Sequence, residues 1–420
     1  MFEIRKIIEN TLRKGFLHLF SANLLVHIIE FASQLFVAFI LFEADIGRIK
    51  SFQSFAAIAL IFANFGFNTS TLKLASEKRS IKNKEQLFST ALYLTFFLGI
   101  ITWVIIYILS YFQLVSNDLT TNKLFVYYAF SIPALALNSL SIAYIQALKK
   151  FKEVSILLVI LRIIQVAIII IATYLYHING FIGGIVVGFS ISAFFLLKKT
   201  NIFSSTIQFN KSIFLEHWKL AKFSFLGNLV STSNLYLDII LLNHLTNQKL
   251  ELGFYGMALT LMTGLRVLTN TVQQYLTPYY SENSNNRDNH LTFFKKTHLV
   301  FIVFALIVSI IIIIISPFFI KLIFNHKYDQ SIFYFQILTV SWFFRSTYSL
   351  IGIFYISISK ININFINSII ILSLSTFPLY YLISNYGVLG AAYSQILTAI
   401  IGAIVVYISL IKHYKFTNEY

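Results

Sequence analysis

Residues 299–316 read LVFIVFALIVSIIIIIIS, eighteen consecutive positions without a charge and with serine as the single polar residue type. Such a stretch predicts a helix that crosses the hydrocarbon core of a bilayer, which takes about 20 residues. Similar segments recur along the chain, whose 420 residues are 57% hydrophobic and only 11% charged. A soluble domain carries roughly 25% charged residues. The sequence therefore predicts an all-α polytopic membrane protein with about twelve transmembrane helices.

The apolar segments define the expected helices, whose ends are less certain than their existence. The predicted ranges are 16–42, 46–68, 86–112, 123–147, 154–176, 178–197, 221–244, 252–277, 292–316, 331–358, 361–383 and 387–411.

Lysine and arginine are distributed unevenly over the segments between these helices. With the N-terminus inside, 23 of the 32 basic residues fall on the cytoplasmic side, 6 on the opposite side and 3 within apolar segments. Because short cytoplasmic loops carry the excess of Lys and Arg, this distribution places both termini in the cytoplasm of a bacterial inner-membrane protein. The net charge of +16 then reflects orientation, and we expect no nucleic-acid partner.

The longest interruption of apolar character lies at about 198–220. It predicts an N-terminal six-helix lobe over 1–200, a cytoplasmic linker over 201–220 and a C-terminal six-helix lobe over 221–420. Glycine motifs recur at nearly constant offsets: Ile46-Gly47 with Leu252-Gly253, and the segment from Gly180 with the one from Gly387. Because both halves hold six helices, the repeat predicts lobes related by a pseudo-twofold axis along the membrane normal.

Five charged residues lie inside apolar segments, where each costs about 2.5–3.5 kcal/mol on insertion scales. They are Glu30, Arg162, Asp238, Arg266 and Arg345. Polar neighbours share their helix faces at steps of three and four: Asn23, His27 and Gln34 with Glu30, and Asn270 and Gln274 with Arg266. These faces predict the lining of a central cavity between the halves.

Other interpretations of these residues stay open. Interhelical hydrogen bonds would also explain isolated polar side chains, Arg162 could extend towards the cytoplasmic interface, and Asp238 could be a structural partner of an arginine. Three arginines against two carboxylates nevertheless favour an anionic substrate, because arginine binds phosphate and carboxylate bidentately. Arg266, Arg345 and Arg162 are the candidate substrate-binding residues.

Enzyme motifs are not evident. The sequence has no cysteine, no Walker A motif and no HExxH pattern, so we expect no catalytic residues, no metal site and no cofactor.

The motif Leu252-Gly253-Phe254-Tyr255-Gly256-Met257-Ala258, followed by Leu276-Thr277-Pro278, resembles the O-antigen and polysaccharide flippases of the Wzx type. The stretch from Asn385 to Ala392, NYGVLGAA, is similar to the start of the last helix in that family. The resemblance covers essentially the whole chain. It implies the superfamily of multidrug, oligosaccharidyl-lipid and polysaccharide exporters, whose two lobes alternate access, and it places Arg266 at the position of a central cation of the eighth helix.

The resemblance also implies a substrate and partners. The substrate would be an undecaprenyl-pyrophosphate-linked oligosaccharide, moved from the cytoplasmic to the periplasmic leaflet. We expect a proton or sodium gradient to drive this transport, with Glu30 or Asp238 as the ion-coupling residue. The expected partners are membrane lipids, a polysaccharide polymerase and chain-length proteins. The alternatives are a drug or cation antiporter of the same superfamily, a membrane glycosyltransferase or polymerase, and a flippase for the peptidoglycan precursor.

Overall fold

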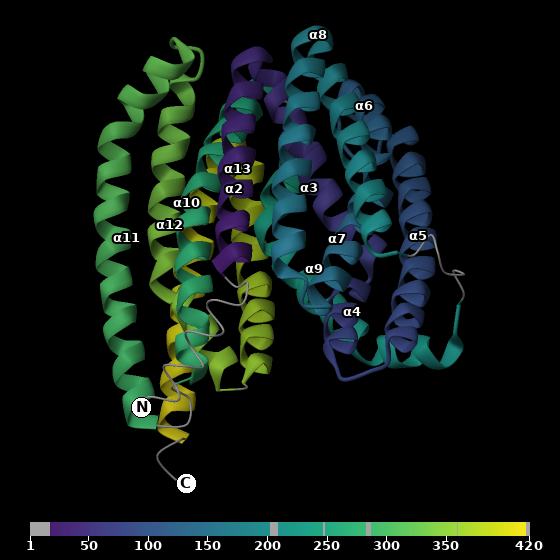
Figure 1. Ribbon diagram of the computed structural model, residues 1–420. Coiled ribbons are helices and arrows are strands. Elements are labelled where there is room, and N and C mark those ends of the chain that lie inside the picture. Colours follow the sequence, from purple (N-terminus) through teal and green to yellow (C-terminus); the bar gives the residue numbers. More distant parts are fainter. Residues whose placement is uncertain (1–16, 202–208, 247, 283–286, 359, 417–420) are drawn as a thin grey trace. The chain divides into compact units, whose positions relative to one another are not determined.

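The computed structural model describes residues 17–201, 209–246, 248–282, 287–358 and 360–416 (Figure 1). These parts of the chain are helical and contain no strand. Their helices are α2 (Leu17–Ile40), α3 (Glu43–Asn64), α4 (Phe67–Ser76), α5 (Ile81–Tyr111), α6 (Leu119–Ala129), α7 (Ser131–Ala147), α8 (Phe151–Lys199), α9 (Lys211–Leu245), α10 (Lys249–Glu282), α11 (Arg287–Phe324), α12 (Asp329–Ser357) and α13 (Ile361–Phe416). The predicted cytoplasmic ends, 1–16 and 417–420, lie outside the described residues.

Two compact units divide the chain. Unit 1 comprises residues 1–41 and 51–232, and unit 2 comprises 42–50 and 233–420. In unit 1, α8 packs against α2 and α7, and α5 packs against α7. In unit 2, α12 packs against α10, α11 and α13. The first two turns of α3 belong to unit 2, and the first two thirds of α9 belong to unit 1.

The membrane spans agree with the predicted segments. Nine helices of the described parts are long and apolar enough to cross a bilayer, and the pair α6 and α7, bent by 42°, provides a tenth span if the two halves act together. The helices α8 and α13 contain 49 and 56 residues. Each is long enough for two crossings, because one crossing takes about 20 residues. Each predicted segment thus overlaps a helix or half of one.

Both long helices are interrupted where the prediction separates two segments. His177 in α8 has φ 51° and ψ −134°, and Gly387 in α13 has φ 57° and ψ −131°. These backbone angles lie in a region that glycine adopts without strain and other residues rarely adopt. The same turn therefore occurs in both units, 210 residues apart.

The helix halves on either side of each turn pack closely. A Cβ added to Gly180 would overlap the carbonyl oxygen of Ala172, and one added to Gly390 would overlap that of Leu382. These contacts again repeat at an offset of 210. The structure thus aligns Gly180 with Gly390, three residues away from the alignment of Gly180 with Gly387 that the motif comparison suggested.

The aromatic residues fill the core of each unit. In unit 1, the rings of Phe88 and Tyr144 stack at 4.3 Å between centroids. In unit 2, Phe294 and Phe354 lie 4.4 Å apart in a cluster that includes the fully buried Tyr280. By contrast, α11 exposes much of its apolar surface, as expected for a helix that faces lipid.

The predicted linker contains the start of a helix. Residues 202–208 lie outside the described residues, and α9 begins at Lys211, ten residues before the predicted start. The ring of His217 is buried there, where Nδ1 pairs with the Ser70 hydroxyl at 2.7 Å and Nε2 with the Leu87 carbonyl at 3.2 Å. Contacts with α4 and α5 thus keep this polar stretch helical. The assignment of 1–200 and 221–420 as lobes remains a prediction.

The hairpin of α8 provides a test of stability. We expect Gly180→Ala to lower the thermal unfolding midpoint of the purified protein in detergent, because the new methyl group forces the two halves of α8 apart. The cost should be about 1–3 kcal/mol. Gly183→Ala is the matched control, since its Cβ would enter open space. Equal midpoints for the two variants would contradict the close packing at Gly180.

Candidate functional site

A cavity of about 270 Å³ lies within unit 2 between α9, α10, α12 and α13. Two arginines and no carboxylate line it. The lining residues are Leu235, Leu259, Met262, Arg266, Thr269, Asn270, Gln273, Leu338, Ser341, Trp342, Arg345, Ser346, Ser349 and Gln395. The cavity therefore combines apolar walls with a positive charge.

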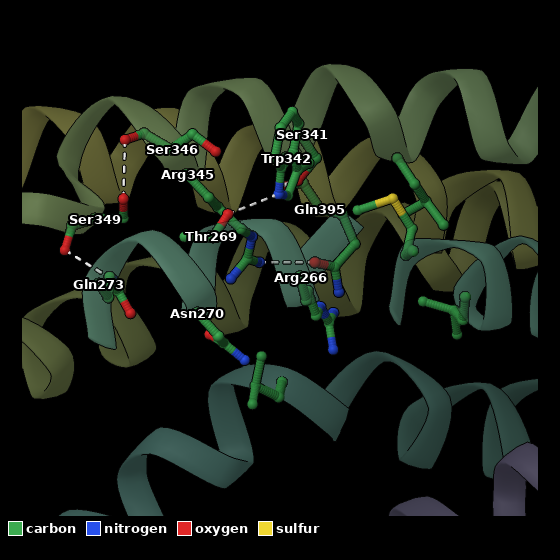
Figure 2. A pocket seen from close by; sticks show the side chains of 14 residues that line it. Arg266, Thr269, Asn270, Gln273, Ser341, Trp342, Arg345, Ser346, Ser349 and Gln395 are labelled. Carbon is green, nitrogen blue, oxygen red and sulfur yellow. Dashed lines mark hydrogen bonds between the residues drawn. The ribbon is translucent and has the colours of Figure 1, made fainter. Parts of the chain in front are cut away.

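Helical spacing brings the polar residues to one place. Arg266, Asn270 and Gln273 follow at steps of four and three on α10, so they share one face. Ser341 and Arg345 are likewise one turn apart on α12. Figure 2 shows the side chains of the two helices converging on the same space.

Hydrogen bonds join the walls of the cavity. Trp342 donates its ring N–H to the Thr269 hydroxyl at 3.0 Å, and Gln273 donates its amide to the Ser349 carbonyl at 2.9 Å. Both bonds connect α10 with α12, and both are drawn in Figure 2. They fix the distance between the helices that carry the two arginines.

The buried carboxylate of Asp238 lies behind the cavity wall. Its Oδ2 accepts hydrogen bonds from the Tyr255 hydroxyl at 2.5 Å and from the Gln395 amide at 2.8 Å. The same Gln395 accepts, through Oε1, a hydrogen bond from Arg345 at 2.7 Å. Asp238 and Arg345 are thus connected through one amide, without a direct ion pair.

Arg266, like Arg345, forms no ion pair with a described carboxylate. The charges of Arg345 and of the buried Lys50 repel it, and the charge of Asp238 attracts it. With two arginines and no carboxylate in its lining, the cavity is cationic on this side.

A second polar cluster lies in unit 1. Arg162 on α8 contacts the Glu30 carboxylate on α2 at 2.7 Å, and His27 lies 3.3 Å from the other Glu30 oxygen. The Arg162 guanidinium is also 5.9 Å from the centre of the Phe189 ring. The carboxylate of Glu30 thus compensates the charge of Arg162.

The predicted site residues therefore fall into two groups. Arg266, Arg345 and Asn270 line the cavity of unit 2, and Asp238 joins them through Gln395. Gln274 is exposed, and its neighbour Gln273 lines the cavity in its place. The other candidates belong to unit 1: Asn23, His27, Glu30 and Gln34 on α2 and Arg162 on α8.

Most lining residues of this cavity were not predicted as site residues, Gln395 and Trp342 among them. Gln395 and Trp342 look like ordinary core residues in the sequence, and no spacing pattern distinguishes them. Lys50, buried within α3, was not predicted as a neighbour of Arg266 either.

Metal binding has no support in the described parts of the chain, where no three His, Cys, Asp or Glu side chains come together. The site offers charge and hydrogen bonds to a ligand.

Comparisons with known proteins agree with this geometry. A family model described as "Polysaccharide biosynthesis protein" matches residues 19–333. No match was found among curated proteins. The fold is similar to that of the lipid II flippase MurJ in an inward closed conformation, with a TM-score of 0.78 and 19% identity over 93% of this chain and 87% of that one.

Transporters of the MATE family show the same fold. An inward-facing multidrug resistance transporter of the MOP superfamily has a TM-score of 0.72 and 12% identity over 93% of this chain and 96% of that one. The Vibrio cholerae MATE transporter VcmN in its bent form has a TM-score of 0.63 and 13% identity over 97% of this chain and 98% of that one. These matches confirm the predicted fold class, and the proteins matched are transporters and flippases rather than enzymes.

The ion pair of unit 1 allows a double-mutant test. We expect Glu30→Gln to lower the thermal unfolding midpoint, because it leaves the half-buried Arg162 guanidinium without its counter-charge. Hydrogen bonds to charged groups are worth about 1.5–3 kcal/mol. The double variant Glu30→Gln with Arg162→Gln should recover part of the loss. Additive effects of the two single changes would show that the pair does not interact.

Proposed function

This chain belongs to the polysaccharide biosynthesis protein family, and we propose that it is a flippase for an undecaprenyl-pyrophosphate-linked oligosaccharide. The substrate would move from the cytoplasmic to the periplasmic leaflet by alternating access. The substrate is the repeat unit of O-antigen or of another surface polysaccharide.

The cationic cavity of unit 2 carries this proposal. A pyrophosphate that crosses a bilayer needs cationic partners, because an unpaired charge in hydrocarbon is very costly. Arg266 and Arg345 face the cavity without a lining carboxylate. The volume of about 270 Å³ is below the range of about 300–1,000 Å³ for drug-sized ligands, so it suits a headgroup rather than a whole oligosaccharide.

The charge of the cavity also weighs against the first alternative. A drug or cation antiporter would require a cavity that attracts cations, whereas two arginines repel them. A membrane glycosyltransferase or polymerase finds no support in the solved structures matched. The peptidoglycan precursor is a second candidate substrate, since one of these structures is a lipid II flippase.

The setting of the protein follows from the charge distribution. In this proposal, the protein lies in the bacterial inner membrane with both termini in the cytoplasm, as the excess of Lys and Arg on that side indicates. The lipid-linked oligosaccharide would pass to a polymerase and chain-length proteins on the periplasmic side.

Arg266 provides the central test of the substrate. We expect Arg266→Ala to reduce surface polysaccharide in a complemented deletion strain by roughly tenfold or more, since a charge-assisted hydrogen bond is worth about 1.5–3 kcal/mol. Arg266→Lys should rescue partly, because lysine lacks the bidentate geometry. Gln274→Ala, at an exposed position of the same helix, is the control. Normal polysaccharide in Arg266→Ala, or a defect in peptidoglycan instead, would exclude this substrate.

The energy source is tested at the two carboxylates. We propose that Glu30 or Asp238 binds the proton or sodium ion that drives transport. In vesicles with an imposed proton or sodium gradient, Glu30→Gln or Asp238→Asn should abolish the response of transport to the gradient while substrate binding persists. A response that survives in both variants would refute the coupling role.

A further inference from the structure

The side chain of Gln395 lies between two opposite charges. Its Nε2 donates to the Asp238 carboxylate at 2.8 Å, and its Oε1 accepts from Arg345 at 2.7 Å. Asp238 and Gln395 are both buried, with 2% and 8% of their surface exposed. The amide therefore occupies the space through which an ion pair between Asp238 and Arg345 would form.

The orientation of this amide is determined by its neighbours. A carboxylate only accepts and a guanidinium only donates, so the amide nitrogen must face Asp238 and the amide oxygen must face Arg345. If the amide were rotated by 180°, its oxygen would face the Asp238 carboxylate, another acceptor, and its NH2 group would face the Arg345 guanidinium, another donor. Ser341, one turn before Arg345 on α12, donates its hydroxyl to the main-chain carbonyl of Gln395 at 2.8 Å. The main chain of Gln395 is thus held by the helix that carries Arg345.

The arrangement has a consequence for the charge of the cavity. A neutral amide occupies one donor of the Arg345 guanidinium, which has five, and does not neutralise its charge. A carboxylate in direct contact would bind the guanidinium bidentately. It would neutralise the charge and occupy the pair of N–H donors that an anionic ligand would otherwise use. The remaining donors of Arg345 can bind an anion as long as the amide stands between Arg345 and Asp238.

We propose that Gln395 is a positioning residue: it holds Arg345 towards the cavity and separates it from Asp238, and so gives the site its preference for anions. This inference rests on the proposed function, because it assigns the reason why the same cavity accepts a pyrophosphate. Gln395 acts through Arg345.

An exchange of the two polar groups tests the inference. The double variant Asp238→Asn with Gln395→Glu keeps the net charge of the wild type but brings the carboxylate into contact with Arg345. Binding of farnesyl pyrophosphate and of uncharged farnesol to the full chain in detergent is measured by calorimetry. We expect the preference for the pyrophosphate to fall by about tenfold or more while farnesol binding is unchanged.

The comparison of the two probes separates positioning from structure. If Gln395 had a purely structural role, the exchange variant would bind both farnesyl pyrophosphate and farnesol more weakly by the same factor. That result would overturn the inference. An exchange variant that retains the wild-type preference would overturn it as well, since net charge alone would then suffice.

A second pair of variants covers the case in which the exchange variant does not fold. Gln395→Met removes the amide at similar volume and lets Arg345 turn to Asp238, so the preference for the pyrophosphate should fall. Adding Asp238→Asn removes the competing carboxylate and should restore it. A preference that persists in Gln395→Met, or that Asp238→Asn does not restore, would contradict the inference.

Arg266→Ala distinguishes the two levels of the argument. If the wild type shows no preference for farnesyl pyrophosphate, or if Arg266→Ala keeps that preference, the proposed function fails. If Arg266→Ala loses the preference and the exchange variant keeps it, the proposed function stands and only the role of Gln395 is refuted.

Discussion

Hydrocarbon offers no hydrogen-bond partners, and this constraint determines how the polar groups of this protein are arranged. Backbone groups satisfy one another within helices, and charged side chains must find partners inside the protein. Glu30 meets Arg162 at 2.7 Å, and Asp238 accepts bonds from Tyr255 and Gln395. A charge that forms no ion pair within the protein is then informative, and Arg266 is such a charge among the residues described.

The distribution of charge matters more than its sum. Three arginines and two carboxylates in apolar segments give a single excess positive charge. In the structure, Arg162 is compensated by Glu30 in unit 1. The excess is therefore concentrated in unit 2, where Arg266 and Arg345 line one cavity and the single carboxylate, Asp238, stands behind an amide.

The turns in α8 and α13 have the same backbone conformation but different residues at the turn. Gly387 adopts its positive φ without a side chain to obstruct it, whereas His177 adopts nearly the same angles with one. The close approach of the helix halves, in contrast, requires glycine at both Gly180 and Gly390. Packing thus restricts the residue type more strictly here than the turn does.

The sequence by itself determined the class of fold, the places of the twelve segments and the charged residues that lie within them. It could do so because hydrocarbon selects long apolar helices and makes each charge within them costly. Only the tertiary structure decided which charges compensate one another, since ion pairs join helices that are far apart in the chain, such as α2 and α8. It also decided the neighbours of Gln395 and Lys50, because a glutamine in an apolar helix and a lysine near a helix start have no distinguishing pattern until their surroundings in space are known.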